Sequence, residues 1–223
     1  MKRHFPGLYA ILDVDALERR GLAVVQAGRA LLLGGPKVLQ LRAKHAGAAQ
    51  TLAWLRSLRG PTRDAGVLLF ANDRADLAEA AGCDGVHVGQ NDLPLEDVRR
   101  AFPRLRVGVS THDVSQLTHT LSARPDYAAL GPVFGTENKR NPEPTVGFDE
   151  LERLSAAAHR ASVPLVAIGG IDEASAVRVA ALGVAVAVIG ALLPDIGVSG
   201  QAAYDEITRR TARLSSLFRP PAT

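Results

Sequence analysis

Three polar side chains alternate with small and apolar ones in one short segment. Gln40, Arg42 and Lys44 are separated by Leu41 and Ala43. Side chains of a β-strand point alternately to its two faces, so the polar groups are expected to share one face. Arginine offers phosphate a planar fork and lysine a mobile charge, and Gln40 could meet a neutral heterocycle. The segment therefore predicts a diphosphate site. The alternative is a strand end whose charged side chains simply extend into solvent.

Two carboxylates follow the next apolar segments. Asp73 comes after Ala71 and Asn72, and Asp92 follows Val88 at a short distance. Each could simply cap the helix that comes next, because Asp is common at that position. Taken together, and near a basic group, they suit Mg²⁺, which typically binds one or two carboxylates together with phosphate oxygens and water. We predict a magnesium site between Asp73 and Asp92.

Further polar groups follow the later apolar segments. Ser110 and His112 lie in one short stretch, where Ser110 could bond a phosphate oxygen. For His112 a structural or helix-capping role competes with proton transfer. Lys139 belongs to the long irregular connection 135–147, which either folds over the site or stays a solvated loop.

The elements that must position these groups alternate between short Val, Ile and Leu segments and longer helical ones. Strands are predicted at 8–12, 38–41, 67–71, 85–88, 106–109, 127–130, 165–168 and 185–189. Helices are predicted at 16–33, 48–59, 74–81, 95–102, 114–122, 148–161, 173–181 and 202–217.

Eight such units predict a closed (β/α)8 TIM barrel of the α/β class. It would form a single domain over residues 1–223, with its core at about 8–217. The alternative is a doubly wound open sheet, which usually has fewer strands and often carries G-x-G-x-x-G after the first one. Here Asp13-Val14-Asp15 follows instead.

In such a barrel the residues at the carboxyl ends of the strands form the active site. The loops after the last two strands often bind phosphate, and there the sequence has Gly169 and Gly170, then Ile189 and Gly190. Glycines let backbone N–H groups approach an anion closely. These positions predict a second phosphate site.

Composition narrows the class of protein. Aromatic residues make up 4% of the chain and hydrophobic residues 47%, so the core must consist mainly of Ala, Val, Leu and Ile. The net charge of +3 comes from scattered basic residues without a basic stripe, which argues against nucleic acid. No apolar stretch could cross a membrane and Cys83 is the only cysteine, so we expect a cytoplasmic protein without disulfides within the chain. Whether it forms a homo-oligomer is left open.

In their order along about residues 8–193, these residues resemble the thiamine phosphate synthase family. The motifs that carry the resemblance are Gln40-Leu41-Arg42-x-Lys44, Asn72-Asp73-Arg74, Gly85-Val86-His87-x-Gly89-Gln90-x-Asp92, Gly108-Val109-Ser110-x-His112, Gly131-Pro132-x-Phe134 and Ile168-Gly169-Gly170-Ile171.

The resemblance implies a transferase that joins 4-amino-2-methyl-5-hydroxymethylpyrimidine diphosphate to a thiazole phosphate and releases pyrophosphate. It assigns the pyrimidine diphosphate to Gln40, Arg42, Lys44, Asn72, Ser110 and Lys139, magnesium to Asp73 and Asp92, and the thiazole phosphate to Thr136, Asn138, Gly170, Ile189 and Gly190. His112 would be accessory. The cationic groups suit a dissociative substitution, because they neutralise the charge of the departing diphosphate.

Two positions depart from the family pattern. Asn138 stands where a second small hydroxyl often follows, and Gly190 where Ser often ends the eighth strand. Both concern the thiazole phosphate, so weakened or rearranged binding is expected there. Three other hypotheses stay open: a thiazole tautomerase with the same barrel, a non-catalytic binder of phosphorylated thiamine intermediates, and another phosphate-binding barrel such as a tryptophan-pathway isomerase.

Overall fold

Eight parallel strands form a closed barrel in the computed structural model, which describes residues 7–135 and 144–218. The strands are β1 (Leu8–Asp13), β2 (Val38–Arg42), β3 (Leu68–Asn72), β4 (Gly85–Val88), β5 (Arg106–Thr111), β6 (Tyr127–Leu130), β7 (Leu165–Ile168) and β8 (Ala185–Val188). Each strand pairs with the next, and β8 pairs with β1 through Leu8 and Val186. This closure confirms the predicted barrel and excludes the open sheet.

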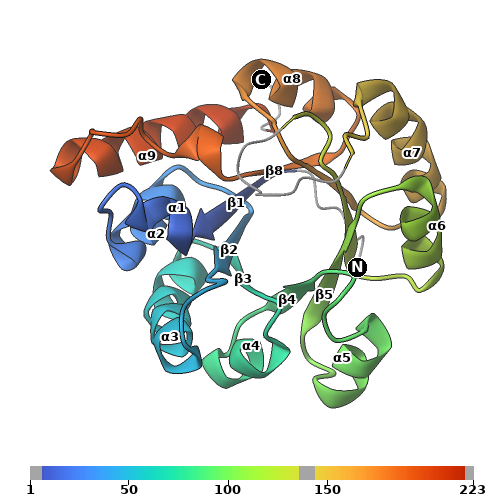
Figure 1. Ribbon diagram of the computed structural model, residues 1–223, viewed down its shortest axis with the longest axis horizontal. Coiled ribbons are helices and arrows are strands. Elements are labelled where there is room, and N and C mark those ends of the chain that lie inside the picture. The colour runs from blue at the N-terminus through green and yellow to red at the C-terminus, as the bar shows by residue number, and fades with distance from the viewer. Residues whose placement is uncertain (1–6, 136–143, 219–223) are drawn as a thin grey trace.

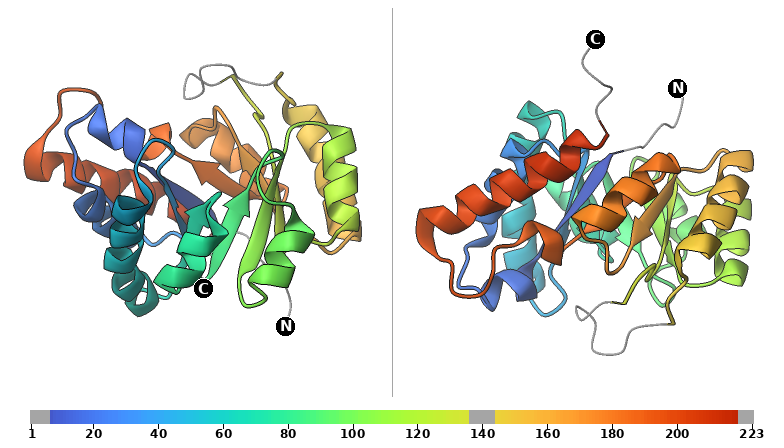
Figure 2. Two further views of the ribbon diagram at one scale, coloured as in Figure 1. Left: turned by 60° about the horizontal axis from the view of Figure 1, so that its bottom comes forward. Right: turned by 90° about the horizontal axis from the view of Figure 1, so that it is seen from above.

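Helices surround the barrel on its outside (Figure 1). They are α1 (Val14–Glu18), α2 (Val24–Leu33), α3 (Ala48–Asp64), α4 (Ala75–Ala81), α5 (Leu95–Ala101), α6 (Val114–Ser122), α7 (Phe148–Arg160), α8 (Glu173–Ala181), α9 (Gly200–Ser216) and the 3₁₀ turn η1 (Gly190–Leu192). Figure 2 shows the same helical layer from two other sides, with the long α9 lying across the outside of the barrel.

The prediction of one helix over 16–33 was wrong. The structure has α1 and α2 there, separated by a turn in which Gly21 has a φ of 63°, in the left-handed region. Helix α1 begins one residue after Asp13, whose Oδ1 accepts the N–H of Ala16 at 2.8 Å. Asp13 therefore ends β1 and starts α1 at the same point.

Two groups of buried side chains fill the molecule. The larger lies between strands and helices and includes Leu41. The smaller fills the inside of the barrel with Tyr9, Ile11, Val38, Phe70, Tyr127, Ala129, Val166, Ala185 and Ala187. Gln40 is 2% exposed and bonds to the smaller group, whereas its neighbour Leu41 belongs to the outer one. The predicted alternation along β2 is confirmed.

Two glycines inside strands make room for the aromatic rings of the barrel interior. A Cβ atom on Gly108 would lie 1.9 Å from Cζ of Tyr127, and one on Gly85 would lie 2.4 Å from Cε1 of Phe70. Both glycines sit beside the ring they accommodate, since Gly108 pairs with Tyr127 and Gly85 with Phe70 in the sheet register.

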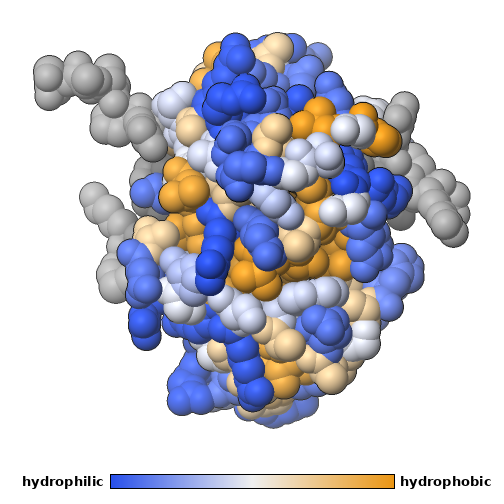
Figure 3. Space-filling view, turned by 90° about the vertical axis from the view of Figure 1, so that its left-hand side faces the viewer, coloured by the Kyte–Doolittle hydropathy of each residue, from blue (hydrophilic) through white to orange (hydrophobic). Residues whose placement is uncertain are grey.

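The face that carries α2 and α9 combines charged and apolar side chains (Figure 3). Leu33 at the end of α2 and Ile196 before α9 are 79% and 77% exposed. Over the residues that the structure describes, no helix combines the length and the apolar character needed to span a bilayer.

Candidate active site

The carboxyl ends of the strands surround a cavity of about 860 Å³. Its lining includes every predicted site residue within the described parts of the chain: Gln40, Arg42, Lys44, Asn72, Asp73, Asp92, Ser110, His112, Gly170, Ile189 and Gly190. Three further predicted residues, Thr136, Asn138 and Lys139, lie outside the described residues. The structure thus brings together groups that are up to 150 residues apart in the sequence.

Arg42 is held by a carboxylate at the end of the neighbouring strand. Asp13 uses Oδ1 for the N–H of Ala16 and Oδ2 for the guanidinium of Arg42. Asp13 is only 5% exposed, and an ion pair of this kind restricts the guanidinium to one orientation at the cavity. Sequence reasoning noted Asp13 but gave it no part in the site, because nothing in the local pattern connects it with Arg42.

Asp73 and Asp92 come together at the rim, as predicted. Burial is the largest cause of a raised pKa at Asp73. The nearby Asp92 carboxylate raises this pKa further, while the ammonium of Lys44 opposes the rise. Lys44 donates to Oδ2 of Asp73, and Oδ2 of Asp92 accepts the N–H of Gly89 at 2.7 Å.

Neither carboxylate caps a helix, so that alternative is excluded. The residue at the cap of α4 is Arg74 and that of α5 is Pro94, and neither helix has a side-chain cap. Asp73 itself has a φ of 63°, a conformation that costs free energy for a residue other than glycine, and its N–H bonds to the carbonyl of His87 at 2.8 Å.

This pair suits a hard divalent cation. Two neighbouring carboxylates repel each other, and a cation between them would remove that repulsion. Within the described ranges no three His, Cys, Asp or Glu side chains converge. Two carboxylates are too few to surround a cation completely. They suit Mg²⁺, which completes its coordination with water and substrate oxygens.

A chain of hydrogen bonds crosses the interior of the barrel below this rim. It joins Ser110 to His87 (2.8 Å), His87 to Tyr127 (2.7 Å), Tyr127 to Tyr9 (2.7 Å), Tyr9 to Gln40 (2.6 Å) and Gln40 to Asn72 (2.7 Å). Both tyrosines are buried, and burial raises the pKa of each well above its ordinary value, which keeps the phenols neutral.

Sequence reasoning missed the central members of this chain. His87 stood in a recognised motif without a role, and Tyr9 and Tyr127 were counted as strand residues. The one available signal was Gly108 within a strand, since such a glycine often marks a close approach by another group. It does not say which ring approaches.

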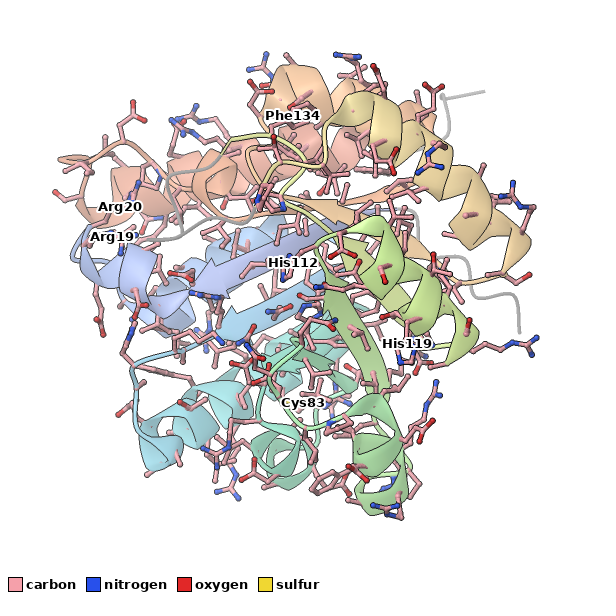
Figure 4. All side chains as sticks on the ribbon, turned by 45° about the vertical axis from the view of Figure 1, so that its right-hand side comes forward. Arg19, Arg20, Cys83, His112, His119 and Phe134 are labelled. Carbon is pink, nitrogen blue, oxygen red and sulfur yellow. The ribbon has the colours of Figure 1, made fainter. Side chains whose placement is uncertain are left out.

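His112, labelled in Figure 4, directly follows β5 and lines the cavity. Its Nδ1 lies 2.6 Å from the carbonyl oxygen of Gly131, which can only accept a hydrogen bond. The cap of α6 is Asp113, so a capping role for the His112 side chain is excluded. The ring is held by Gly131, the residue that follows β6, and remains part of the cavity lining.

Glycine backbone forms the opposite wall. Gly169 and Gly170 have φ values of 99° and 62°, in the left-handed region. A Cβ atom on Gly170 would lie 2.3 Å from the carbonyl oxygen of Gly135, so no side chain fits there. Ile189 and Gly190 enter the cavity where η1 begins.

Comparison with known proteins identifies the family of this chain. Residues 8–192 match the sequence profile of a family described as thiamine monophosphate synthase. A thiamine-phosphate synthase of Koribacter versatilis is 44% identical over 194 residues, 85% of this chain and 90% of that protein. One from Chloroflexus aurantiacus is 37% identical over 214 residues, 94% of this chain and 91% of that protein.

Solved structures give the same result for the fold. A thiamine phosphate pyrophosphorylase from Pyrococcus furiosus has a TM-score of 0.78 and 29% identity, and the match covers 95% of this chain and 98% of that one. A tryptophan synthase structure from M. tuberculosis, with a TM-score of 0.65 and 14% identity, shares the barrel alone. The profile match and the sequence relatives together show that this chain belongs to the thiamine monophosphate synthase family.

Proposed function

We propose that this chain is a thiamine-phosphate synthase, which joins 4-amino-2-methyl-5-hydroxymethylpyrimidine diphosphate to a thiazole phosphate or its carboxylated form and releases pyrophosphate. One observation carries the proposal: the cations of Arg42 and Lys44 lie with the carboxylates of Asp73 and Asp92 around one cavity. Such a set suits a diphosphate bound together with a divalent cation.

The first substrate would occupy the side of the cavity formed by β2 to β5. Gln40 and Asn72 would meet the pyrimidine, and Arg42, Lys44 and Ser110 would contact the diphosphate. Lys139, outside the described residues, is proposed as a further diphosphate contact. Asp13 would keep the Arg42 guanidinium in position throughout.

The reaction is proposed to be a dissociative substitution. The bond between the methylene carbon and the diphosphate oxygen breaks first, both electrons leave with pyrophosphate, and the pyrimidine carries the positive charge. The thiazole nitrogen then donates its lone pair to that carbon and forms the new bond. Arg42 and Lys44 stabilise the charge that grows on the departing oxygen, which is usually the largest catalytic contribution.

Asp73 and Asp92 would hold the magnesium ion. When bound, Mg²⁺ supplies further positive charge to the diphosphate oxygens. No group in this scheme has to remove a proton from carbon, so we assign no general base. His112 remains a candidate accessory group at the same mouth.

The thiazole phosphate would lie on the glycine wall. We assign it to Gly170, Ile189 and Gly190, with Thr136 and Asn138 outside the described residues. At position 190 only the backbone N–H is available, and the left-handed backbone of Gly170 lets another N–H approach the phosphate. Binding of this substrate is therefore expected to depend on backbone more than on side chains.

The deciding experiment measures thiamine phosphate and pyrophosphate from the two substrates, with magnesium and with a chelator. We expect product only with magnesium. Aromatisation of the thiazole phosphate without coupling would identify a tautomerase instead. Tight pyrimidine diphosphate binding without pyrophosphate release under any condition would identify a non-catalytic binder. Thiamine phosphate formed in chelator would contradict the magnesium requirement, and the absence of any reaction or binding with either substrate would point to another phosphate-binding barrel.

A further inference from the structure

Two arginines hold consecutive backbone carbonyl groups in the connection between β8 and α9. Nε of Arg20, just after α1, donates to the carbonyl oxygen of Pro194 at 2.8 Å. Nη1 of Arg210, within α9, donates to the carbonyl oxygen of Leu193 at 2.6 Å. The direction of both bonds is certain, because a carbonyl oxygen only accepts and a guanidinium only donates. We call this pair, Arg20 and Arg210, the arginine clamp.

The carbonyl groups of the clamped segment have no place in regular structure. Leu193 and Pro194 follow η1 and precede α9, outside any helix or strand. Both residues are buried. A buried carbonyl group without a hydrogen bond costs free energy comparable to a lost hydrogen bond. The arginine clamp therefore stabilises this particular path of the backbone.

The charges of the arginine clamp are balanced by neighbouring acids. Burial is the largest cause of a lowered pKa at Arg20. The charges of Arg19 and Arg210 lower this pKa further, and that of Asp195 opposes them. Arg210 forms ion pairs with Glu206 at 2.6 Å and with Asp195 at 3.4 Å. Two carboxylates thus match the two cations, which suits a clamp on backbone better than a site for an external anion.

The clamped segment is one turn away from the cavity. The N–H of Leu193 bonds to the carbonyl of Gly190 at 3.0 Å, and the N–H of Leu192 to that of Ile189 at 3.2 Å. Ile189 and Gly190 line the cavity, whereas the clamp arginines are not among the described lining residues. Because these i to i+3 bonds form one tight turn, a shift of Leu193 also moves Gly190.

We propose that Arg20 and Arg210 are positioning residues for the second substrate: they hold η1 so that the backbone of Ile189 and Gly190 stays in place for the thiazole phosphate. The inference rests on the proposed function for the identity of this ligand. Glycine has the most backbone freedom of any residue, so a binding turn that contains Gly190 gains most from support outside the cavity.

Hydrogen–deuterium exchange of the ligand-free full chain tests the clamp without any substrate. Arg210→Ala should speed exchange of the Leu192 and Leu193 amides by about tenfold or more, because loss of a hydrogen bond to a charged group favours local opening. The segment 165–171, which contains β7 and its glycines, should exchange as in the wild type. Unchanged exchange at Leu192 and Leu193 would overturn the proposal.

The chain offers a matched control for each clamp arginine. Arg19 and Arg209 directly precede Arg20 and Arg210, and both are exposed. Arg19 and Arg20 are labelled in Figure 4. Arg19→Ala and Arg209→Ala remove the same side chain from the adjacent position and should leave exchange in η1 unchanged. Equally fast exchange in these controls would show general loosening of the helices and would overturn the proposal.

Steady-state kinetics separates positioning from a general loss of structure. Arg20→Ala and Arg210→Ala should raise KM for the thiazole phosphate by about tenfold, because small displacements of a binding group are costly. KM for the pyrimidine diphosphate should stay within about twofold, since its predicted contacts belong to β2–β5. Equal rises in both KM values would mean a purely structural role.

Arg210→Ala is the cleaner of the two alanine variants. Arg20 also donates to the carbonyl of Ala16 within α1 at 3.0 Å, so its removal affects that helix as well. If an alanine variant does not fold, Arg20→Lys or Arg210→Lys takes its place. Lysine keeps a donor but loses the planar fork, so smaller changes in the same direction are expected, and wild-type exchange together with wild-type KM would overturn the proposal.

Failure of the clamp and failure of the proposed function give different results. Absence of product from the wild type would count against the function, while faster exchange in Arg20→Ala and Arg210→Ala would still support the clamp on η1. Product formation with wild-type exchange and wild-type KM values in both variants would leave the function intact and overturn the positioning role.

Discussion

The carboxylate of Asp13 fixes the guanidinium of Arg42 at the mouth of the barrel. Oδ2 of Asp13 accepts from the guanidinium, and Oδ1 caps α1. One side chain at the end of β1 therefore contacts both the start of α1 and the Arg42 guanidinium of β2. The capping and the ion pair can be separated by experiment, because asparagine caps a helix about as well as aspartate but carries no charge.

Asp13→Asn should lower kcat/KM for the pyrimidine diphosphate by about 10- to 100-fold, the effect of losing a hydrogen bond between charged groups. The melting temperature should change little. Asp113→Asn, at the cap of α6, is the matched control and should retain activity. Wild-type kcat/KM in Asp13→Asn would mean that Arg42 does not need this partner.

Asp92→Ala should reduce turnover by about 100-fold or more while lowering the free energy of unfolding by about 1 kcal/mol, mainly from the N–H of Gly89 left without its acceptor. Wild-type protein should melt at a higher temperature with Mg²⁺ than without, and the variant should lose that difference. Asp113→Ala should show the reverse pattern, with stability lowered and turnover kept. Parallel losses of turnover and stability in Asp92→Ala would argue for a structural role.

Gly108→Ala should destabilise the barrel by about 1–3 kcal/mol, because the new methyl group would overlap the ring of Tyr127. It should also lower activity, since displacement of that ring breaks the contact with His87. Gly47→Ala is the control, as nothing lies within 4 Å of its added Cβ. Denaturant unfolding measures the stability of both variants, and equal stability of the two would contradict the packing argument.

Cys83 should be unreactive in the folded protein. Burial raises the pKa of its thiol from 9.0 to about 12, so at pH 8 only about one molecule in 10⁴ carries the thiolate that reacts. Alkylation should be slow until the chain is unfolded by denaturant. Rapid alkylation of the native protein at pH 8 would contradict the burial.

The same thiol should make stability depend on alkaline pH. Its folded pKa lies above its unfolded value, so its contribution is fully present below about pH 9 and is lost as pH rises toward 12. The difference in unfolding free energy between wild type and Cys83→Ala should therefore shrink over that window. A constant difference would show that the folded and unfolded pKa values are the same.

Residues near the ends of strands could be assigned from sequence because two periodic rules determine them. Alternation along β2 placed Gln40 inside and Leu41 outside, and the order of apolar segments put Asp73 and Asp92 in the connections after neighbouring strands. Those rules depend only on neighbours in the chain, and the closed barrel then brought the strand ends together.

Contacts across the barrel could not be assigned in this way. Tyr9 and Tyr127 are separated by 118 positions, and their hydroxyl contact depends on how strands β1 and β6 face each other through the interior. The break between α1 and α2 was missed for a different reason: apolar residues continue on both sides of Gly21, whereas the structure ends α1 at Glu18 and turns the chain through the left-handed backbone of Gly21.

The ion pair between Lys44 and Asp73 has a consequence for how ligands bind. A cation that binds Oδ2 of Asp73 would displace the Lys44 ammonium, which then becomes available to an anion. Metal and diphosphate should accordingly show positive cooperativity, each increasing the affinity for the other by the same factor, as thermodynamic linkage requires. Lys44 would then act as an exchangeable counterion, neutralising Asp73 in the ligand-free protein and the diphosphate once magnesium has bound.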